Sequence, residues 1–437
     1  MNRQFTSFTI ADHQQFKQQM LSWANRFNIC CFLDNQQYHL PHHHYECLLA
    51  AGAVEYLELS AGTAFDQLQE LYEKRKDWLF GHLGYDLKNE LEPLQSNHHD
   101  GVGFADLFFF VPAIVLQLKN NELHISSLQA TPEQIFKEIT ATVINNYEEE
   151  SDPVNINSRF NRQQYIDTVQ KLRQHILRGD CYEINFCQEF FAEGVTIDPL
   201  AVYNALSKTS PNPFAAFYKN NDRYLLCASP ERYLNKTGSH IYSQPIKGTS
   251  PRNRNNEIAD AVSKNQLYNS AKDRSENVMV VDLVRNDLSK VCEEGTVQVD
   301  ELFGIYSFPQ VHQMISTVSG TVRNDATIAT ILKATFPMGS MTGAPKRRVM
   351  ELVEQYERTR RGVYSGAVGY ITPAGDFDFN VVIRSILYNA SQRYLSFQAG
   401  SAITFYSDPE QEYEECLLKA AAIRQVLGKV GKLTAAK

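Results

Sequence analysis

Apolar residues recur at helical spacing in the middle of the chain. Tyr165, Val169, Leu172 and Ile176 are three to four residues apart, the spacing of one face of an amphipathic helix. Gly179 follows them, and glycine commonly ends helices because it adopts a left-handed backbone easily. The pattern therefore predicts a helix that ends just before Gly179.

A second helix is predicted to begin near Asp408. Its carboxylate can accept from free amides of the first turn, and Pro409 fits the first helical position. Glu412 and Glu415 are three residues apart and so share one face of this helix. A solvated acidic face is the simplest interpretation of the two glutamates, and joint binding of a ligand is the alternative.

Strands are predicted where apolar residues alternate with polar ones or form short runs bounded by turn residues. These stretches are residues 30–33, 78–86, 113–118, 180–188, 224–228, 362–370, 377–384 and 397–403. The first three belong to a mixed amino-terminal lobe, over residues 1–145. The polar, acidic residues 145–153 are typical of a linker, and a second domain is expected over residues 155–430.

Composition and charge exclude several classes of protein. The 437 residues are 43% hydrophobic and 21% charged, enough for a large core, and a net charge of -8 without a basic stripe argues against nucleic acid and membrane surfaces as partners. Residues 107–116 form the longest apolar stretch, shorter than the roughly 20 residues of a membrane span. Without an apolar leader or C-x-x-C spacing, a cytoplasmic location is expected.

Chemistry is suggested by a lysine in a constrained turn. Lys247 is followed by Gly248 and flanked by Pro245 and Pro251, so backbone geometry fixes its position. A solvated loop lysine is the ordinary interpretation of such a residue. A carboxylate, Glu231, follows the predicted strand 224–228 directly, which favours a functional interpretation of both side chains.

Several ordered motifs together resemble the chorismate-utilising enzymes. The resemblance covers roughly residues 160–425 and is carried by residues 229–232, 245–249, 270–287, 336–346, 362–370 and 407–419. It implies an α+β, anthranilate-synthase-like fold, with large β-sheets packed face to face and helices outside. It also implies that residues 155–430 form the chorismate-binding catalytic domain.

Two positions distinguish the branches of this family. Lys247 resembles the aminodeoxychorismate synthase branch, since anthranilate synthases carry alanine there. Glu183 matches neither the glutamine usual in aminating members nor the lysine of the isochorismate-forming members, and a carboxylate disfavours that water-adding branch. The family's histidine position holds Gln313, so no histidine role passes to His312.

The resemblance also implies roles for individual residues. Lys247 would be a covalent nucleophile at C2 of chorismate, its pKa lowered by roughly three units, and Glu231 would be the acid for the leaving hydroxyl. Glu276 and Glu415 would hold Mg²⁺. The implied substrate-binding residues are Thr249, Tyr364, Arg384 and Gly400. For Arg384, in a predicted apolar strand, a structural ion pair is the alternative.

These roles predict an enzyme of transaminase type, in EC class 2.6.1. It would be component I of aminodeoxychorismate synthase and convert chorismate and ammonia to 4-amino-4-deoxychorismate for 4-aminobenzoate and folate. Because none of the eight cysteines lies in a G-x-C-x-G context, a glutamine amidotransferase subunit is the expected ammonia source. The alternatives are anthranilate synthase component I and a non-catalytic regulatory subunit that binds chorismate or tryptophan. Some family members bind tryptophan, and no residue pattern here decides whether this chain does.

Overall fold

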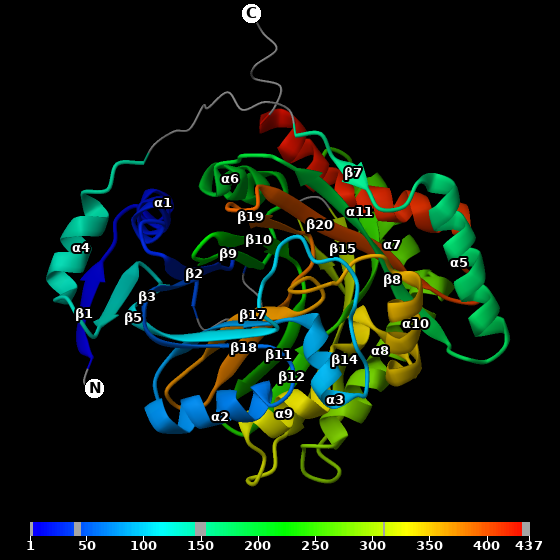
Figure 1. The fold of residues 1–437 in the computed structure, drawn as a ribbon, viewed down its shortest axis with the longest axis horizontal. Coiled ribbons are helices and arrows are strands. Elements are labelled where there is room, and N and C mark those ends of the chain that lie inside the picture. The colour runs from blue at the N-terminus through cyan, green and yellow to red at the C-terminus, as the bar shows by residue number, and fades with distance from the viewer. Residues whose placement is uncertain (1–2, 39–44, 145–153, 309–310, 431–437) are drawn as a thin grey trace, which may run out of the picture.

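The computed structural model describes residues 3–38, 45–144, 154–308 and 311–430. The strands pair antiparallel in two layers that lie face to face (Figure 1). The first layer runs in the order β1 (Gln4–Thr9), β6 (Glu122–Ser127), β5 (Leu107–Lys119), β3 (Cys47–Leu59), β2 (Ile29–Asp34), β9 (Phe214–Asn220), β10 (Arg223–Ser229), β19 (Ser385–Asn389), β20 (Tyr394–Ile403) and β8 (Glu183–Glu193). The short β7 (Asn157–Ser158) and β16 (Gly343–Ala344) extend its far edge beside β8.

The second layer begins on the same two long strands. From β3 and β5 it continues through β4 (Leu79–Leu83), β17 (Ala367–Ile371), β18 (Phe377–Val381), β11 (Arg232–Thr237), β12 (His240–Gln244) and β15 (Val311–Thr321), with β13 (Ile246–Pro251) and β14 (Gln298–Ser307) beside β15. The expected anthranilate-synthase-like arrangement of facing sheets is therefore present.

The two layers are joined where β3 and β5 bend. Gly52 has a φ of +70°, a conformation that glycine adopts without strain, and a bulge follows it between Ala53 and Glu55. Pro112 lies opposite Ala53. A proline is tolerated at a bulge because no ladder hydrogen bond is required of it. The strand predicted over residues 113–118 thus runs through Pro112 and begins at Leu107.

Alternation along the strands creates two cores. In β2, Ile29 and Cys31 face the core shared by the two layers, whereas Cys30 and Phe32 face the outer helices. The helices on that outer side are α1 (His13–Ala24), α4 (Pro132–Thr140), α5 (Arg162–Leu177), α6 (Pro199–Thr209), α10 (Lys346–Tyr356) and α11 (Pro409–Val430). The helices α2 (Ala64–Arg75), α8 (Ala271–Ser289) and α9 (Ile328–Thr335) cover the second layer.

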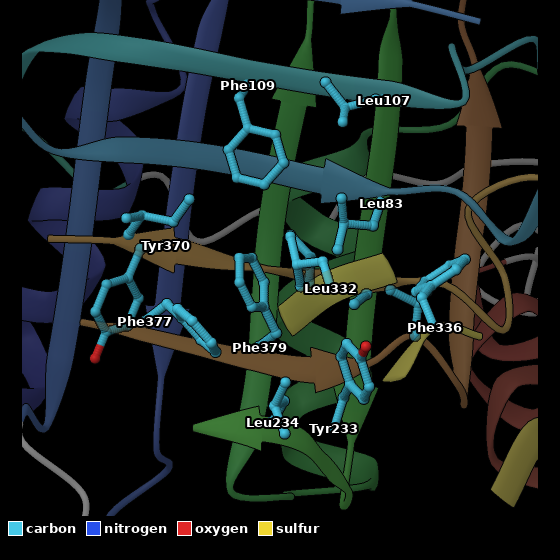
Figure 2. Packing of buried hydrophobic residues seen from close by; sticks show 14 of the residues in the cluster. Leu83, Leu107, Phe109, Tyr233, Leu234, Leu332, Phe336, Tyr370, Phe377 and Phe379 are labelled. Atoms are coloured by element: carbon cyan, nitrogen blue, oxygen red, sulfur yellow. The ribbon is translucent and has the colours of Figure 1, made fainter. Parts of the chain in front are cut away.

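Close packing of aromatic and aliphatic side chains holds the second layer to its helices. Leu332 of α9 and Phe336 lie beside Tyr233 and Phe379, which project from the sheet (Figure 2). The Tyr233 and Phe336 rings meet edge to face at 6.2 Å. Helix α9 and the residue that follows it are thereby packed against the second layer.

The predicted helix boundaries are confirmed. Helix α5 begins with a capping box, in which the side chains of Asn161 and Gln164 each accept a hydrogen bond from the other residue's backbone amide. Gly179 follows the end of the helix with a φ of +83°. Helix α11 begins at Pro409, and Asp408 accepts from the amides of Glu410 and Gln411. Local sequence signals were sufficient at these ends.

The division into domains at residues 145–155 stays a prediction. The predicted linker 145–153 lies outside the described residues. Strands of both predicted domains share ladders, because β2 pairs with β9 and β4 pairs with β17. Along the described ranges, none of the helices combines the length and apolar character needed to cross a bilayer.

The glycine in β4 provides a test of the packing between strands. A Cβ on Gly81 would lie 1.9 Å from the carbonyl oxygen of Phe108, a backbone atom that cannot move aside. We expect Gly81→Ala to lower the free energy of unfolding by about 3 kcal/mol, measured by urea denaturation. Gly428→Ala in α11 is the control, because no atom lies within 4 Å of its added Cβ and alanine favours helices. Equal stabilities for the two variants would contradict this account.

Candidate active site

A bulge in β13 turns Lys247 toward the interior. Gly248 has a φ of +93°, and the register with β15 shifts between Ile246 and Thr249. A Cβ on Gly248 would lie 2.9 Å from the Cβ of Asp273 in α8, so glycine also permits the close approach of that helix. Lys247 is 8% exposed. The interpretation as a solvated loop lysine is therefore wrong.

Lys247 forms an ion pair with Glu183, the first residue of β8. Its Nζ donates to Glu183 Oε1 at 2.6 Å, and both side chains are buried. Burial alone would lower the pKa of Lys247, but the charges of Glu183, Glu276 and Glu231 outweigh it and raise the pKa. The expectation of a lowered lysine pKa is wrong for this arrangement, because it omitted Glu183.

Glu231 occupies the corner between β10 and β11 and is buried. Burial raises the pKa of its carboxyl to about 7, although a hydrogen bond from Ser340 and the charge of Lys247 act in the opposite direction. Glu231 therefore exists in both protonation states near neutral pH. A buried carboxyl in this condition can act as a general acid.

Arg384 lies beyond the end of β18, not within a strand. The strand stops at Val381, and Arg384 has a φ of +50° in the turn that leads to β19. Burial lowers the pKa of its guanidinium, partly offset by the charge of Glu231. No hydrogen bond or ion pair of the Arg384 side chain exists within the described part of the chain, so the structural ion pair is not found. Such a cation can bind an incoming carboxylate.

Three further carboxylates gather where α8 meets α11. Lys272 Nζ of α8 lies 3.3 Å from Glu412 Oε1 and 3.9 Å from Glu276 Oε1. On the same face of α11, Glu415 accepts from Lys419 at 2.8 Å. Burial raises the pKa of Glu276 to about 7. Lys247 and Lys272 oppose this rise in pKa, whereas Glu183 and Glu415 add to it.

The carboxylate group fits a hard cation but is not a preformed metal cage. Glu276 Oε1, Glu412 Oε2 and Glu183 Oε2 are buried and accept no hydrogen bond from the described residues. Within those residues, no three His, Cys, Asp or Glu side chains are gathered closely enough to hold a metal alone. Mg²⁺ usually takes one or two carboxylates and completes its shell with water and substrate oxygens. Glu276 and Glu415, with Glu412 beside them, match that type of site.

The remaining predicted residues fall in different surroundings. Tyr364 is buried, with its hydroxyl 3.4 Å from Cys187 Sγ. Gly400 pairs with Cys187 across β20 and β8, and a Cβ there would lie 2.0 Å from the Phe186 carbonyl oxygen. Glycine at this position therefore has a packing reason. Thr249 is exposed on β13, so the structure does not place its side chain with the buried group.

Sequence reasoning missed Lys272 and placed Glu412 on the face of Glu415 without assigning it a role. Each carries a helical signal: Glu412 lies three residues before Glu415, and Lys272 lies four before Glu276. His312 binds Asp260 at 3.1 Å and Ser307 at 2.8 Å. These partners agree with the expectation that His312 has no role in the site around Lys247.

Comparison with known proteins supports the same class. Residues 21–425 match the family of chorismate binding enzymes. The chain belongs to this family. Its fold is similar to anthranilate synthase component I of Streptococcus pneumoniae, with a TM-score of 0.76, 27% identity and coverage of 86% of this chain and 91% of that one. The isochorismate synthase MenF of Escherichia coli shares the fold alone, with a TM-score of 0.75 and 16% identity over 98% of this chain and 95% of that one.

Similar curated proteins are aminodeoxychorismate synthases. Component 1 from Bacillus subtilis is 35% identical over 61% of this chain and 56% of its own length. The Streptomyces pristinaespiralis protein is 41% identical over 62% of this chain and 38% of its own length. The chloroplastic protein of Arabidopsis thaliana is 35% identical over 78% of this chain and 39% of its own length. The chain thus spans less than two thirds of the length of each of these three relatives.

The protonation of Glu231 can be tested through stability. The folded state holds this proton more tightly than the unfolded chain, so stability is lost as pH rises from the ordinary pKa of 4.5 to about 7. Relative to Glu231→Gln, the wild type should lose about 3 kcal/mol of unfolding free energy between about pH 4 and pH 8. Urea denaturation at several pH values measures this difference. Glu193→Gln, at the exposed end of β8, is the control, and a pH-independent difference for Glu231→Gln would contradict the raised pKa.

Proposed function

We propose that this protein is component I of an aminodeoxychorismate synthase. It converts chorismate and ammonia to 4-amino-4-deoxychorismate, which leads to 4-aminobenzoate and folate, by an amino transfer of EC class 2.6.1. The observation that carries the proposal is the buried Lys247, which is paired with Glu183 and feels the charge of the nearby acid Glu231. The names of the similar aminodeoxychorismate synthases support it.

Each buried group has one task in this reaction. The amine of Lys247 attacks C2 of chorismate and forms a carbon–nitrogen bond. Glu231 gives its proton to the C4 hydroxyl, which leaves as water with the electrons of the C4–O bond. Ammonia then bonds to C4, and the C2–N bond breaks to release the lysine. Arg384, with a guanidinium not already paired in the described residues, binds a substrate carboxylate.

Mg²⁺ would bind at Glu276 and Glu415, with Glu412 nearby, and would neutralise and orient a carboxylate of the substrate. In this protein Lys272 already provides positive charge among these carboxylates. Its side chain is 45% exposed, so it can move into solvent when another cation enters. Contacts from Thr249, Tyr364 and the amide of Gly400 to the substrate stay predictions.

The ammonia would come from a glutamine amidotransferase subunit. All eight cysteines are buried, and burial raises the thiol pKa of Cys30 to about 12 and that of Cys181 to about 11. Such thiols are poor nucleophiles for a glutaminase step. Relatives named component 1, from Bacillus subtilis and Salmonella typhimurium, support a two-component enzyme.

The activity is tested with chorismate, Mg²⁺ and either ammonium or glutamine. We expect the purified chain to form 4-amino-4-deoxychorismate with ammonium and no product with glutamine, because it contains no reactive cysteine. Mass spectrometry and chromatographic comparison with standards identify the product. Anthranilate would support the runner-up enzyme, which Lys247 disfavours, and the absence of any product would support a regulatory subunit. Product from glutamine by the chain alone would contradict the need for a partner.

The cation site is tested by direct binding. We expect Glu276→Gln and Glu415→Gln to weaken Mg²⁺ binding at least about tenfold, the effect of roughly 1.4 kcal/mol, because each removes a ligand charge. Isothermal titration calorimetry measures the affinity without turnover. Glu414→Gln is the matched control, since Glu414 is exposed on another face of α11.

Lys272→Met should act in the opposite direction in the same titration, because it removes a cation that competes for Glu412 and Glu276. Identical binding curves for the three glutamate variants would show that Glu276 and Glu415 do not bind Mg²⁺.

A further inference from the structure

Because Lys247 is held in an ion pair with Glu183, the removal of its proton is a step of the reaction that needs a base. Only a neutral amine attacks carbon, because the lone pair must be free. Lys247 is protonated at rest, since burial, which would lower its pKa, is outweighed by Glu183, Glu276 and Glu231. A proton must therefore leave Lys247 Nζ before or during attack, and a specific group must accept it.

Within the described residues, Glu183 is the side chain that accepts a hydrogen bond from Lys247 Nζ. The distance of 2.6 Å is short enough for direct proton transfer without an intervening water. Glu183 is 1% exposed and begins β8, where the ladder to β16 fixes its backbone opposite Ala344. Its second oxygen, Oε2, is buried and accepts no hydrogen bond from any described residue, so among these residues no other hydrogen bond holds the carboxylate in its charged form.

We propose that Glu183 is the catalytic base that takes the proton from Lys247 as its amine attacks the substrate. This inference rests on the covalent role proposed above for Lys247. The N–H bond breaks, an O–H bond forms at Glu183 Oε1, and the freed lone pair makes the bond to C2. When the amine is later expelled by ammonia, the proton returns from Oε1 to Nζ, and the ion pair is restored.

Burial assists this transfer. In water, a lysine ammonium and a glutamate carboxylate differ by about six pKa units, which opposes the neutral pair. Inside the protein, the transfer replaces two buried charges with two neutral groups and so removes the desolvation cost of both. The other charged groups that interact with this pair are Glu231 at the β10–β11 corner, Glu276 of α8 and Glu415 of α11, and Lys272 faces Glu276 from the same helix.

The nearby carboxylates are poorer candidates for this base. Glu231 is partly protonated near neutral pH and is assigned to the leaving hydroxyl. Glu276 faces Lys272 on its own helix and belongs to the group that fits a cation. Neither donates to nor accepts from Lys247 Nζ in the described residues, so geometry selects Glu183.

The test uses Glu183→Gln, which keeps the shape and one acceptor oxygen but cannot take a proton. Wild type, this variant, Glu183→Asp and the control Glu193→Gln, on the exposed end of the same strand, are mixed with chorismate and Mg²⁺ without ammonia. The rate at which a substrate adduct forms on Lys247 is followed by quenched intact-protein mass spectrometry at several pH values. Lys247→Ala, which should form none, verifies the modified residue.

We expect Glu183→Gln to form the adduct about 10²- to 10³-fold more slowly near neutral pH, the usual size of a general-base effect. Relative to the wild-type rate, its rate should rise about tenfold per pH unit, because its lysine proton must go to solvent. The loss of the Glu231 proton near pH 7 affects both proteins alike and cancels in this ratio. Glu183→Asp should keep the wild-type pH profile at a reduced rate. Chorismate affinity, measured by calorimetry, should change less than about threefold in either variant.

Four results would overturn the proposal. If Glu183→Gln forms the adduct at the wild-type rate and with the same pH profile, Glu183 is not the base. If it forms the adduct faster, the carboxylate only holds Lys247 protonated. If Glu183→Gln does not fold, Glu183→Asp decides, and a tenfold rise per pH unit of its rate relative to the wild type is contrary to the proposal. A wild type that makes product without any adduct would refute the covalent step itself, and the proposed overall activity would stand.

Discussion

The cost of burying charge governs this site. Lys247 and Glu183 lie almost fully out of solvent, and each is tolerated there because the other neutralises it at 2.6 Å. The same cost raises the pKa of Glu231 and of Glu276 to about 7, since neither has a cation in direct hydrogen-bonding contact among the described residues. Lys247 and the three glutamates Glu183, Glu231 and Glu276 thus form one electrostatic unit, in which each protonation state depends on the neighbours.

The facing sheets make this unit possible by bringing together distant segments. Glu183 begins β8 in one layer, Lys247 lies on β13 in the other, and Glu231 occupies the corner where β10 leads into β11. Local departures from regular strands aim the side chains: the bulge at Gly248 turns Lys247 inward, and the left-handed backbone at Arg384 follows the end of β18. Such departures are common next to functional sites, where a regular ladder would point side chains elsewhere.

Much of the fold followed from the sequence because its signals are local. The cap at Asp408, the helical spacing before Gly179 and the short apolar run in β2 each act within a few residues. The resemblance to a family supplied the facing sheets, which no local pattern contains. The errors arose where the deciding partner is distant. The strand predicted from residue 113 in fact continues through Pro112, because this proline lies opposite a bulge in β3. The ion pair of Lys247 was not predicted, because its partner Glu183 is 64 residues away in the sequence.

That distant partner also changes the chemical argument. A lysine with a lowered pKa would be a free amine waiting for substrate, and it would need no base. A lysine held by Glu183 rests as an ammonium and becomes a nucleophile only when its proton has somewhere to go. The site then contains a carboxylate that accepts a hydrogen bond from Lys247 and a second, Glu231, whose environment favours its protonated form. Two chemically identical side chains are thereby assigned opposite tasks by their surroundings, one to take a proton from the amine and the other to give one to the leaving group.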